Sequence, residues 1–449
     1  MKLNKKIIKG FFTAAVLMLS ACQIEEVVDP NNPSLAGVLS NASKAELQGL
    51  VTGLEARHRA YFDNATEMFG SFGREVWAYF ASDPRFIADW LGKNGSTYPD
   101  FFASAGTYVD PYLAVKQANI LIRSVENTNV LTAQEANGYA GFAKTIKGYQ
   151  LIWPLMQQYQ NGIRVDVEDP LNPGPTLNFT QALAAIRGIL DEGAADLANA
   201  GSAFDFSLTM GFATPAEMLQ VNRAIAARVA LYAEDYNGAL TALGGSFMDM
   251  NVTAATRAKL QNGPVHVYGN APDIANPLFY IKDAATSTIL IVHPAMIEDL
   301  LPGDERASKF FQRTTPATNS GNPFPGEYQD GRWETNTDPI PFIRNEELIL
   351  INAEANAMSG STTSAVNAIN VIRNAWGLGD YTGATDQNSL IEEILFQRRY
   401  SLWAEGGHRW IDLRRTGKLD AAHVDLRDGG TIFTQVERRN SEINWDENN

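Results

Sequence analysis

The side chains best able to do chemistry lie in one run near the C-terminus, Leu390–Leu419, which is dense in arginine and carboxylate groups. Arginine can hold a substrate carboxylate or phosphate through two parallel hydrogen bonds, so the run could form an active site. The same geometry also builds structural joints, and we favour that interpretation: an ionic network that locks a helix-turn-helix against the core. The charged residues of interest are Arg398, Arg399, Glu405, Arg409 and Asp412.

Two helices must position these groups. Apolar residues recur at helical spacing in residues 389–405 and predict a helix with one buried face. The Gly406-Gly407 pair breaks that helix, and a short second helix follows and ends at Gly417.

The run resembles the C-terminal signature of the SusD/RagB family, the surface nutrient-binding lipoproteins of Bacteroidetes-type outer membranes. Ser401 stands where the family usually has Glu, and one extra residue separates Glu405 from Arg409. A second block, residues 342–373, resembles the upstream R-x-x-E-L, A-E-A and I-N-x-x-R segments of the family. The residues that match the signature are Arg398, Arg399, Leu402, Glu405, Gly406, Arg409, Asp412, Leu413, Arg415 and Gly417.

The resemblance implies a mainly α fold: a tetratricopeptide-like helix-pair scaffold with long irregular loop insertions and little β structure. It implies a non-enzymatic protein without a cofactor that binds an oligosaccharide or peptide nutrient. The family delivers that nutrient to a TonB-dependent (SusC-like) outer-membrane transporter and acts as its lid. Two alternatives stay open, an all-α surface glycoside hydrolase and a repeat scaffold without a small ligand.

The N-terminus reads as a lipoprotein export signal. Residues 1–21 combine four lysines, a short apolar run and small residues, which is typical of a secretory signal and too short to span a membrane. Cys22, the only cysteine, ends a lipobox-like sequence, so we expect it to carry the acyl chains (palmitate) that anchor the protein. Glu25 and Glu26 resemble an export signal to the cell surface. We therefore expect a lipid-anchored protein of the outer membrane that faces outward.

The charge of the chain excludes some partners. The formal net charge of −15 becomes −19 once the four lysines of the signal are removed, because that segment contains no acidic residue. A body this acidic has no electrostatic footprint for DNA or RNA. Since Cys22 has no second cysteine, the chain can form no internal disulfide and no cysteine-rich metal site.

Helical periodicity organises the mature chain. We expect a signal over 1–21, a lipidated tether over 22–41 and one α-helical domain over 42–449. Within it, residues 244–341 lose the helical period and form a loop-rich insert, and residues 342–449 hold the signature. The predicted helices cover about 43–54, 65–81, 109–127, 132–160, 180–200, 214–234, 236–243, 345–358, 362–376 and 389–405.

Aromatic residues in the irregular segments are the candidates for ligand binding. A sugar ring presents apolar C–H faces that stack on exposed aromatic rings, although most large aromatics serve core packing. Trp90, Tyr98 and Trp333 lie beside polar, Gly- or Pro-containing segments, so we expect them to be exposed. The candidate ligand-binding residues are Trp90, Tyr98, Tyr268, Tyr280 and Trp333.

Enzyme and metal signatures are absent from the sequence. It has no H-E-x-x-H, G-x-S-x-G, Walker A or G-x-G-x-x-G pattern, and its five histidines show no metal-ligand spacing. Glycoside hydrolysis needs only two carboxylates, but we interpret the many acidic residues as solvated surface charge.

Overall fold

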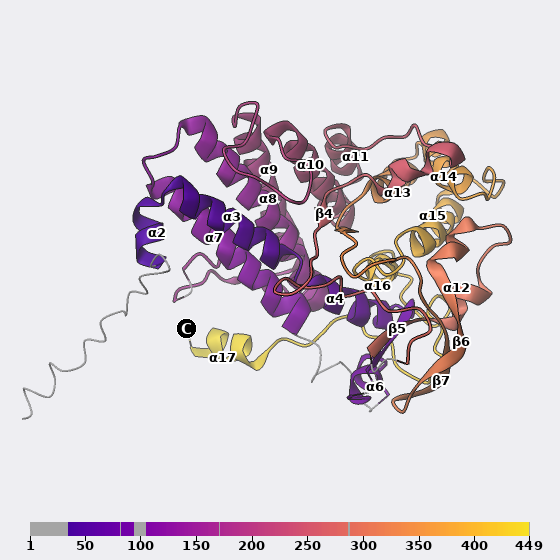
Figure 1. The fold of residues 1–449 in the computed structure, drawn as a ribbon. Helices are drawn as coiled ribbons and strands as arrows, with labels where there is room; N and C mark the ends of the chain where they lie inside the picture. Colours follow the sequence, from indigo (N-terminus) through magenta and orange to yellow (C-terminus); the bar gives the residue numbers. More distant parts are fainter. Residues whose placement is uncertain (1–34, 81, 94–104, 170, 286–287, 449) are drawn as a thin grey trace, which may run out of the picture.

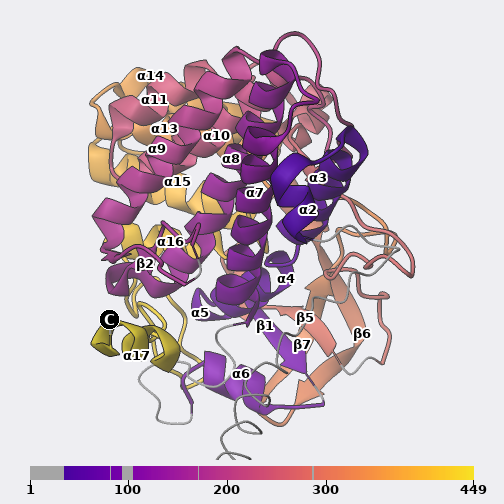
Figure 2. The ribbon, with the colours of Figure 1, turned by 90° about the vertical axis from the view of Figure 1, so that its left-hand side faces the viewer.

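The computed structural model describes residues 35–80, 82–93, 105–169, 171–285 and 288–448. Most of these residues form helices that pack side by side in the order of the chain (Figures 1 and 2). The expected mainly α fold is therefore confirmed. The long helices are α3 (Lys44–His58), α7 (Asp110–Asn127), α8 (Ala133–Gln158), α9 (Phe179–Ala198), α10 (Pro215–Tyr232), α11 (Tyr236–Gly244), α13 (Asn345–Met358), α14 (Thr362–Ala375) and α15 (Gln387–Ser401).

Local signals explain where several of these helices begin. The Ser43, Thr132 and Thr214 side chains each accept a hydrogen bond from the backbone N–H three residues on. In each case the glutamate at that third position accepts a hydrogen bond from the backbone N–H of the capping residue, which completes a capping box. These caps satisfy backbone donors that the helix itself leaves free, and the predicted helix starts are confirmed to within a residue.

A four-stranded antiparallel sheet lies at one end of the helix array (Figure 2), with the strand order β1-β5-β7-β6. Its strands are β1 (Val76–Phe80), β5 (Thr288–Val292), β6 (Phe310–Asn319) and β7 (Asn322–Asp330). Two short strand pairs join β2 (Ile163–Arg164) to β3 (Thr176–Leu177) and β4 (Val265–His266) to β8 (Ile340–Pro341).

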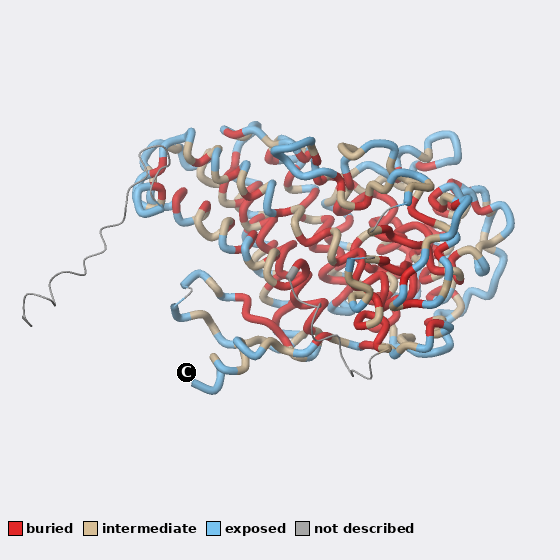
Figure 3. The backbone as a smooth tube through the Cα atoms, turned by 60° about the horizontal axis from the view of Figure 1, so that its bottom comes forward, coloured by how far each residue is buried: buried red, intermediate tan, exposed pale blue. Residues whose placement is uncertain are grey.

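Shorter elements complete the fold. They are α2 (Leu35–Asn41), α4 (Phe62–Asn64), η1 (Ala65–Phe69), α5 (Gly70–Phe72), α6 (Arg85–Trp90), η2 (Ala105–Val109), η3 (Tyr159–Asn161), η4 (Ala254–Gln261), α12 (Pro294–Glu298), η5 (Glu305–Lys309), α16 (His408–Arg415) and α17 (Asn440–Asn448). Buried backbone runs through the middle of the helix array, and α17 contains no buried residue (Figure 3).

One sequence prediction about secondary structure was wrong. The helix predicted over 65–81 gives way to strand β1, because Val76–Phe80 is rich in aromatic and β-branched residues and pairs with β5. The insert over 244–341 contains the β6–β7 hairpin, which the prolines at 316, 323 and 325 obscured. Strand β6 is an edge strand with irregular register, where proline is tolerated.

Buried ion pairs join the C-terminal helices to the rest of the array. Arg398 Nε donates to Asp412 Oδ2 at 2.6 Å, and Arg415 donates to Asp412 and to Glu354. The Arg398 Nη1 and Nη2 atoms have no hydrogen-bond partner among the described residues. Arg344 holds Glu405 at 2.9 Å, which ties the start of α13 to the turn before α16. The arginine–carboxylate run is thus a set of structural joints between α13, α15 and α16.

The other two signature arginines lie at the rim of this network. Arg399 pairs with Asp299 at 2.8 Å, and Arg409 donates to the His423 carbonyl oxygen at 3.0 Å. Arg409 forms no ion pair with a described residue, so it does not share the pairing of Arg398.

The Gly406-Gly407 turn requires glycine at both positions. Gly407 has φ +74°, and a Cβ atom there would overlap Phe69 of η1. Gly417 has a similar φ of +69° but no other heavy atom lies within 4 Å of the corresponding Cβ position. Gly407 and Gly417 therefore both need a left-handed backbone, and of these two only Gly407 also lacks space for a side chain.

We predict that Gly407→Ala lowers the free energy of unfolding by about 3 kcal/mol or more, because left-handed strain and overpacking add. Gly417→Ala, the matched control, should cost about 1 kcal/mol from strain alone. Urea unfolding followed by circular dichroism measures both. If both variants lose the same free energy of unfolding, the contact with Phe69 makes no contribution to stability.

Candidate ligand-binding face

Two long loops, residues 267–283 and 330–336, lie beside the π-helical turn η1. The backbone N–H of Asn276 donates to the carbonyl oxygen of Asn336 at 2.8 Å, and the Asn336 side chain donates to Asn270 at 3.0 Å. These bonds hold the two loops together. We call residues 267–283 and 330–336, with Asp63 and Glu67, the loop face.

Tyr280 connects the loop face to η1. Its side chain is half-buried, and its hydroxyl donates to Glu67 Oε1 at 3.3 Å. Gln329 of β7 donates to the Tyr280 carbonyl oxygen at 3.4 Å, so the backbone of Tyr280 is also tied to the sheet.

Tyr268 belongs to the same loop but is only 4% exposed. The guanidinium carbon of Arg59 lies 5.6 Å from the centre of its ring, and Arg59 in turn pairs with Asp273. The Tyr268 hydroxyl has no hydrogen-bond partner among the described residues. A buried hydroxyl in this state retains its full capacity to bind a polar group.

Trp333 is half-buried on the second loop. Its Nε1 donates to Asp330 Oδ2 at 3.2 Å, and the guanidinium of Arg332 lies 5.0 Å from the ring centre. Asp330 also holds Arg332 at 2.6 Å, which fixes the position of both side chains. The ring is therefore positioned by its neighbours while part of its surface stays open.

The exposure expected of Trp90 is wrong. Trp90 ends α6 and is 0% exposed, with its ring edge-to-face against Phe80 at 5.8 Å and Phe86 at 5.6 Å. The polar residues around it in the sequence do not prevent α6 from packing its apolar side on the sheet. Tyr98 and Cys22 lie outside the described residues.

The structure adds two carboxylates that sequence reasoning missed, Asp63 and Glu67. Burial and the nearby charge of Asp63 together raise the pKa of Glu67 to about 8, against the hydrogen bond from Tyr280. Burial also raises the pKa of Asp63. Glu67 lies in a π-helical turn, a distortion that is frequent at functional sites, but no residue pattern in the sequence marks it.

Exposed apolar side chains surround these polar groups. Val267, Ile274 and Ile281 are 37%, 50% and 66% exposed. Together with Tyr280 and Trp333 they give the loop face apolar surface beside hydrogen-bonding groups, the combination that binds small organic ligands.

Within the described ranges, no cluster of three or more His, Cys, Asp or Glu side chains is arranged to hold a metal ion. No helix in the described part of the chain is long and apolar enough to cross a membrane. A cavity of about 1080 Å³ lies apart from the loop face, between the helices and α17.

We predict that Glu67 makes the protein less stable as pH rises from about 5 to about 8. The unfolded carboxyl releases its proton near pH 4.5, whereas the folded one holds it to about pH 8, so stability falls over that window by about 1.4 kcal/mol per pH unit. Glu67→Gln should remove this contribution, which thermal unfolding at pH 5 and pH 8 measures.

Glu75 provides a companion variant away from the loop face, because burial raises its pKa to about 8 as well. Glu75→Gln should remove a second, separate part of the decrease in stability with pH.

If the stability of wild type and of Glu67→Gln changes with pH in parallel, Glu67 is ionised in the folded protein.

Residues 315–449 match the model of the SusD family. A SusD-like protein of Formosa agariphila is 36% identical over 87 residues, which are 18% of this chain and 17% of that protein. The alignment with this curated relative thus spans less than a fifth of its length.

Solved structures share the fold over nearly the whole chain. A SusD superfamily protein from Bacteroides vulgatus gives a TM-score of 0.63 at 17% identity and covers 86% of this chain and 92% of its own. Surface glycan-binding protein A from Bacteroides uniformis gives 0.65 at 15% identity, over 90% and 98%. The protein of the same name from Bacteroides thetaiotaomicron, in complex with laminarihexaose, gives 0.63 at 15% identity, over 89% and 95%. Residues 315–449 thus match the SusD family in sequence, and the fold of the chain matches that of solved SusD superfamily proteins.

Proposed function

We propose that this chain is a surface lipoprotein that binds a nutrient oligosaccharide on the loop face and delivers it to a TonB-dependent, SusC-like transporter. Cys22 carries the lipid that anchors it in the outer membrane, with the protein facing outward. The chain acts without enzymatic turnover, as the lid of the transporter. A peptide is the alternative nutrient.

The observation that carries this proposal is the composition of the loop face in a chain with this fold. Tyr280 and Trp333 are half-buried and held by hydrogen bonds to Glu67 and Asp330. Aromatic rings fixed in this way offer flat apolar surface at little entropic cost, and the neighbouring carboxylates accept hydrogen bonds from sugar hydroxyl groups. The complex of a structural relative with laminarihexaose supports an oligosaccharide over a peptide.

The lipid anchor would place the protein beside a transporter, and its loops on a rigid scaffold suit the role of a lid. Acyl chains on Cys22 confine the protein to the membrane surface, where its effective concentration near a transporter is high. Irregular loops on a rigid scaffold can then close over the nutrient on one side, while the helix array contacts the transporter on the other.

Binding to the loop face predicts a specific loss. Trp333→Ala should weaken the binding of the recognised oligosaccharide by about 10-fold to 100-fold, because the ring and its fixed position are both lost. Isothermal titration calorimetry with laminarihexaose as the first probe, followed by other oligosaccharides and peptides, measures the affinity.

The matched control is Tyr381→Ala, which removes a half-buried aromatic side chain outside the loop face. It should bind the same probe as wild type does. Normal binding by Trp333→Ala, with a melting temperature like that of wild type, would exclude the loop face. Steady turnover of the glycan by pure protein would favour the glycoside hydrolase alternative.

The transporter partnership predicts a stable complex in the membrane. The full-length protein used as bait in detergent-solubilised outer membranes should retain a large TonB-dependent barrel at near-equal stoichiometry. Cys22→Ala should leave the membrane fraction, because it cannot be acylated. If no barrel is retained by the wild-type protein, the chain is a free-standing binder or a scaffold. If Cys22→Ala stays in the membrane fraction, the lipid anchor is contradicted.

A further inference from the structure

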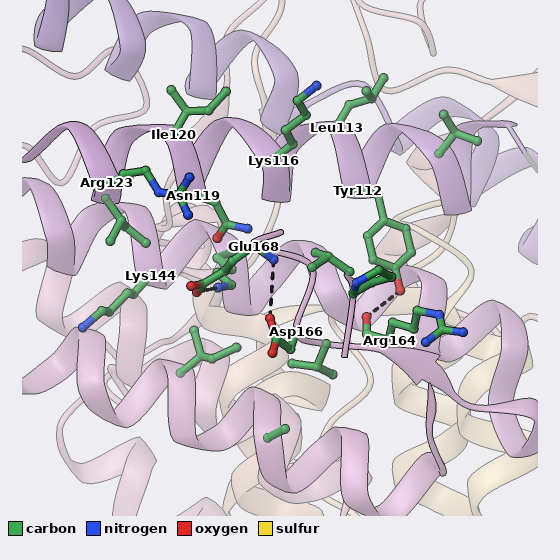
Figure 4. Close-up of a pocket in the computed structure, with 18 of the residues that line it drawn as sticks. Tyr112, Leu113, Lys116, Asn119, Ile120, Arg123, Lys144, Arg164, Asp166 and Glu168 are labelled. Atoms are coloured by element: carbon green, nitrogen blue, oxygen red, sulfur yellow. Dashed lines mark hydrogen bonds and ion pairs between the residues drawn. The ribbon is translucent and has the colours of Figure 1, made fainter. Parts of the chain in front are cut away.

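A cavity of about 1080 Å³ lies between α7, α8, α9, α17 and the segment after β2 (Figure 4). None of its lining residues belongs to the loop face. We call it the helix groove. Its charged lining residues are Lys116, Arg123, Glu126, Lys144, Lys147, Arg164, Asp166, Glu168, Glu192, Arg439 and Glu442.

A carboxylate of the protein itself occupies the cationic centre of the helix groove. Glu168 reaches from the segment after β2 to Lys147 on α8, with 3.0 Å between Oε1 and Nζ. The Lys147 side chain is 7% exposed, whereas that of Glu168 is 59% exposed. The hydrogen bond from Lys147 lowers the pKa of Glu168, and the charges of Lys147, Arg123 and Lys144 lower it further. A largely exposed carboxylate thus sits on a buried ammonium that has two further cations nearby.

An unpaired amide lies next to this centre. The Asn119 side chain projects from α7 into the groove toward Glu168 (Figure 4). Its Oδ1 and Nδ2 atoms are inaccessible to solvent and have no hydrogen-bond partner in the described chain. Such a group costs free energy unless a ligand or water pairs with it. An amide that offers one donor and one acceptor side by side suits neighbouring hydroxyl groups of a sugar.

Two cations of the helix groove that have no acidic partner among the described residues lie on α7. Lys116 and Arg123 lie on α7 about one turn on either side of Asn119, both are exposed, and neither forms an ion pair with a described residue. Three of the other acids are already engaged: Glu192 pairs with Lys144, Glu442 pairs with Arg164, and Asp166 accepts a hydrogen bond from the Glu168 backbone. Glu126 follows Arg123 by three residues on the same helix.

Aromatic residues stand along the groove, as carbohydrate binding requires. It is lined by Tyr108 of η2, by Tyr112 at the start of α7 and by Trp445 of α17. The Tyr112 hydroxyl donates to the Arg164 carbonyl oxygen at 2.7 Å, which fixes that ring in place. Rings, a free amide and cations together match a sugar that carries a negative charge.

We propose that the helix groove binds an oligosaccharide with carboxylate groups, a uronic acid, whose carboxylate replaces Glu168 on Lys147. Asn119 then pairs with ring hydroxyl groups, and Arg123 supports the carboxylate. The inference rests on the proposed glycan-binding function and adds a second site with its own ligand class. An acidic peptide fits the cations equally well, but the aromatic lining and the amide favour the sugar.

The test is calorimetric titration of the full mature chain with tetragalacturonate. Glu168→Gln should tighten binding about threefold, because the competing carboxylate is gone. Arg123→Ala and Asn119→Ala should weaken it about 10-fold, because each removes a contact to a charged or polar group of the ligand. Arg123 is exposed, and the Asn119 amide has no hydrogen-bond partner in the described chain, so neither change removes a hydrogen bond from the fold and both variants are expected to fold.

Arg57→Ala is the matched control, since Arg57 is an exposed cation on α3 outside the groove. It should bind tetragalacturonate like wild type, as should Trp333→Ala. No binding to wild type or Glu168→Gln overturns the proposal, and so does weaker binding by Glu168→Gln. Loss in Trp333→Ala alone would place the acidic sugar on the loop face.

Two further outcomes separate the ligand classes and the two sites. Preference for poly-glutamate, lost in Arg123→Ala, would overturn the sugar in favour of a peptide. If only the loop-face proposal is wrong, Trp333→Ala will bind laminarihexaose with the affinity of wild type. The groove variants will still change the affinity for tetragalacturonate.

Discussion

The structure depends on the pairing of charges that are buried between its helices. Arg228 of α10 and Glu347 of α13 are each about 2% exposed and lie 2.5 Å apart. Burial alone would raise the pKa of Glu347, but the charges of Arg228 and His408 lower it to about 2. Removing one partner of such a pair leaves an uncompensated charge and costs about 3–5 kcal/mol. The helices must therefore keep one relative placement.

That placement extends to the loop face. The backbone N–H of Gly406 donates to Thr66 Oγ1 at 3.1 Å, and Gly407 contacts Phe69, so the turn of the signature packs directly on η1. The same turn η1 carries Glu67, which accepts the hydrogen bond from Tyr280. A structural signature at the C-terminus thus supports the position of the loop that carries Tyr280, more than a hundred residues earlier in the chain.

The molecule separates two polar environments. On the loop face, acidic groups and half-buried aromatics dominate, and the carboxylates of Asp63 and Glu67 hold raised pKa values because of burial. In the helix groove, the cations Arg123 of α7 and Lys144 and Lys147 of α8 lie near the carboxylate of Glu168. In a strongly acidic protein, such a cationic cluster is where an anionic ligand meets the least repulsion.

Sequence alone determined the helix array, because helical periodicity and capping are local. The capping boxes at Thr132 and Thr214 and the glycine turn at Gly406-Gly407 could be recognised from spacing. The mainly α fold was expected from these patterns and from the resemblance of the C-terminal run to the SusD/RagB signature. Strand β1 was missed because its aromatic residues continue a helical pattern, and only pairing with β5 makes them a strand.

Tertiary structure alone decided the exposure and the electrostatics of the candidate sites. The neighbours of Trp90 in the sequence suggest an exposed ring, but packing on the sheet buries it completely. The pKa of Glu67 depends on burial and on Asp63, and the role of Glu168 depends on helices that are distant in sequence. Burial and electrostatic fields sum over all surrounding atoms, so no local pattern of residues specifies them.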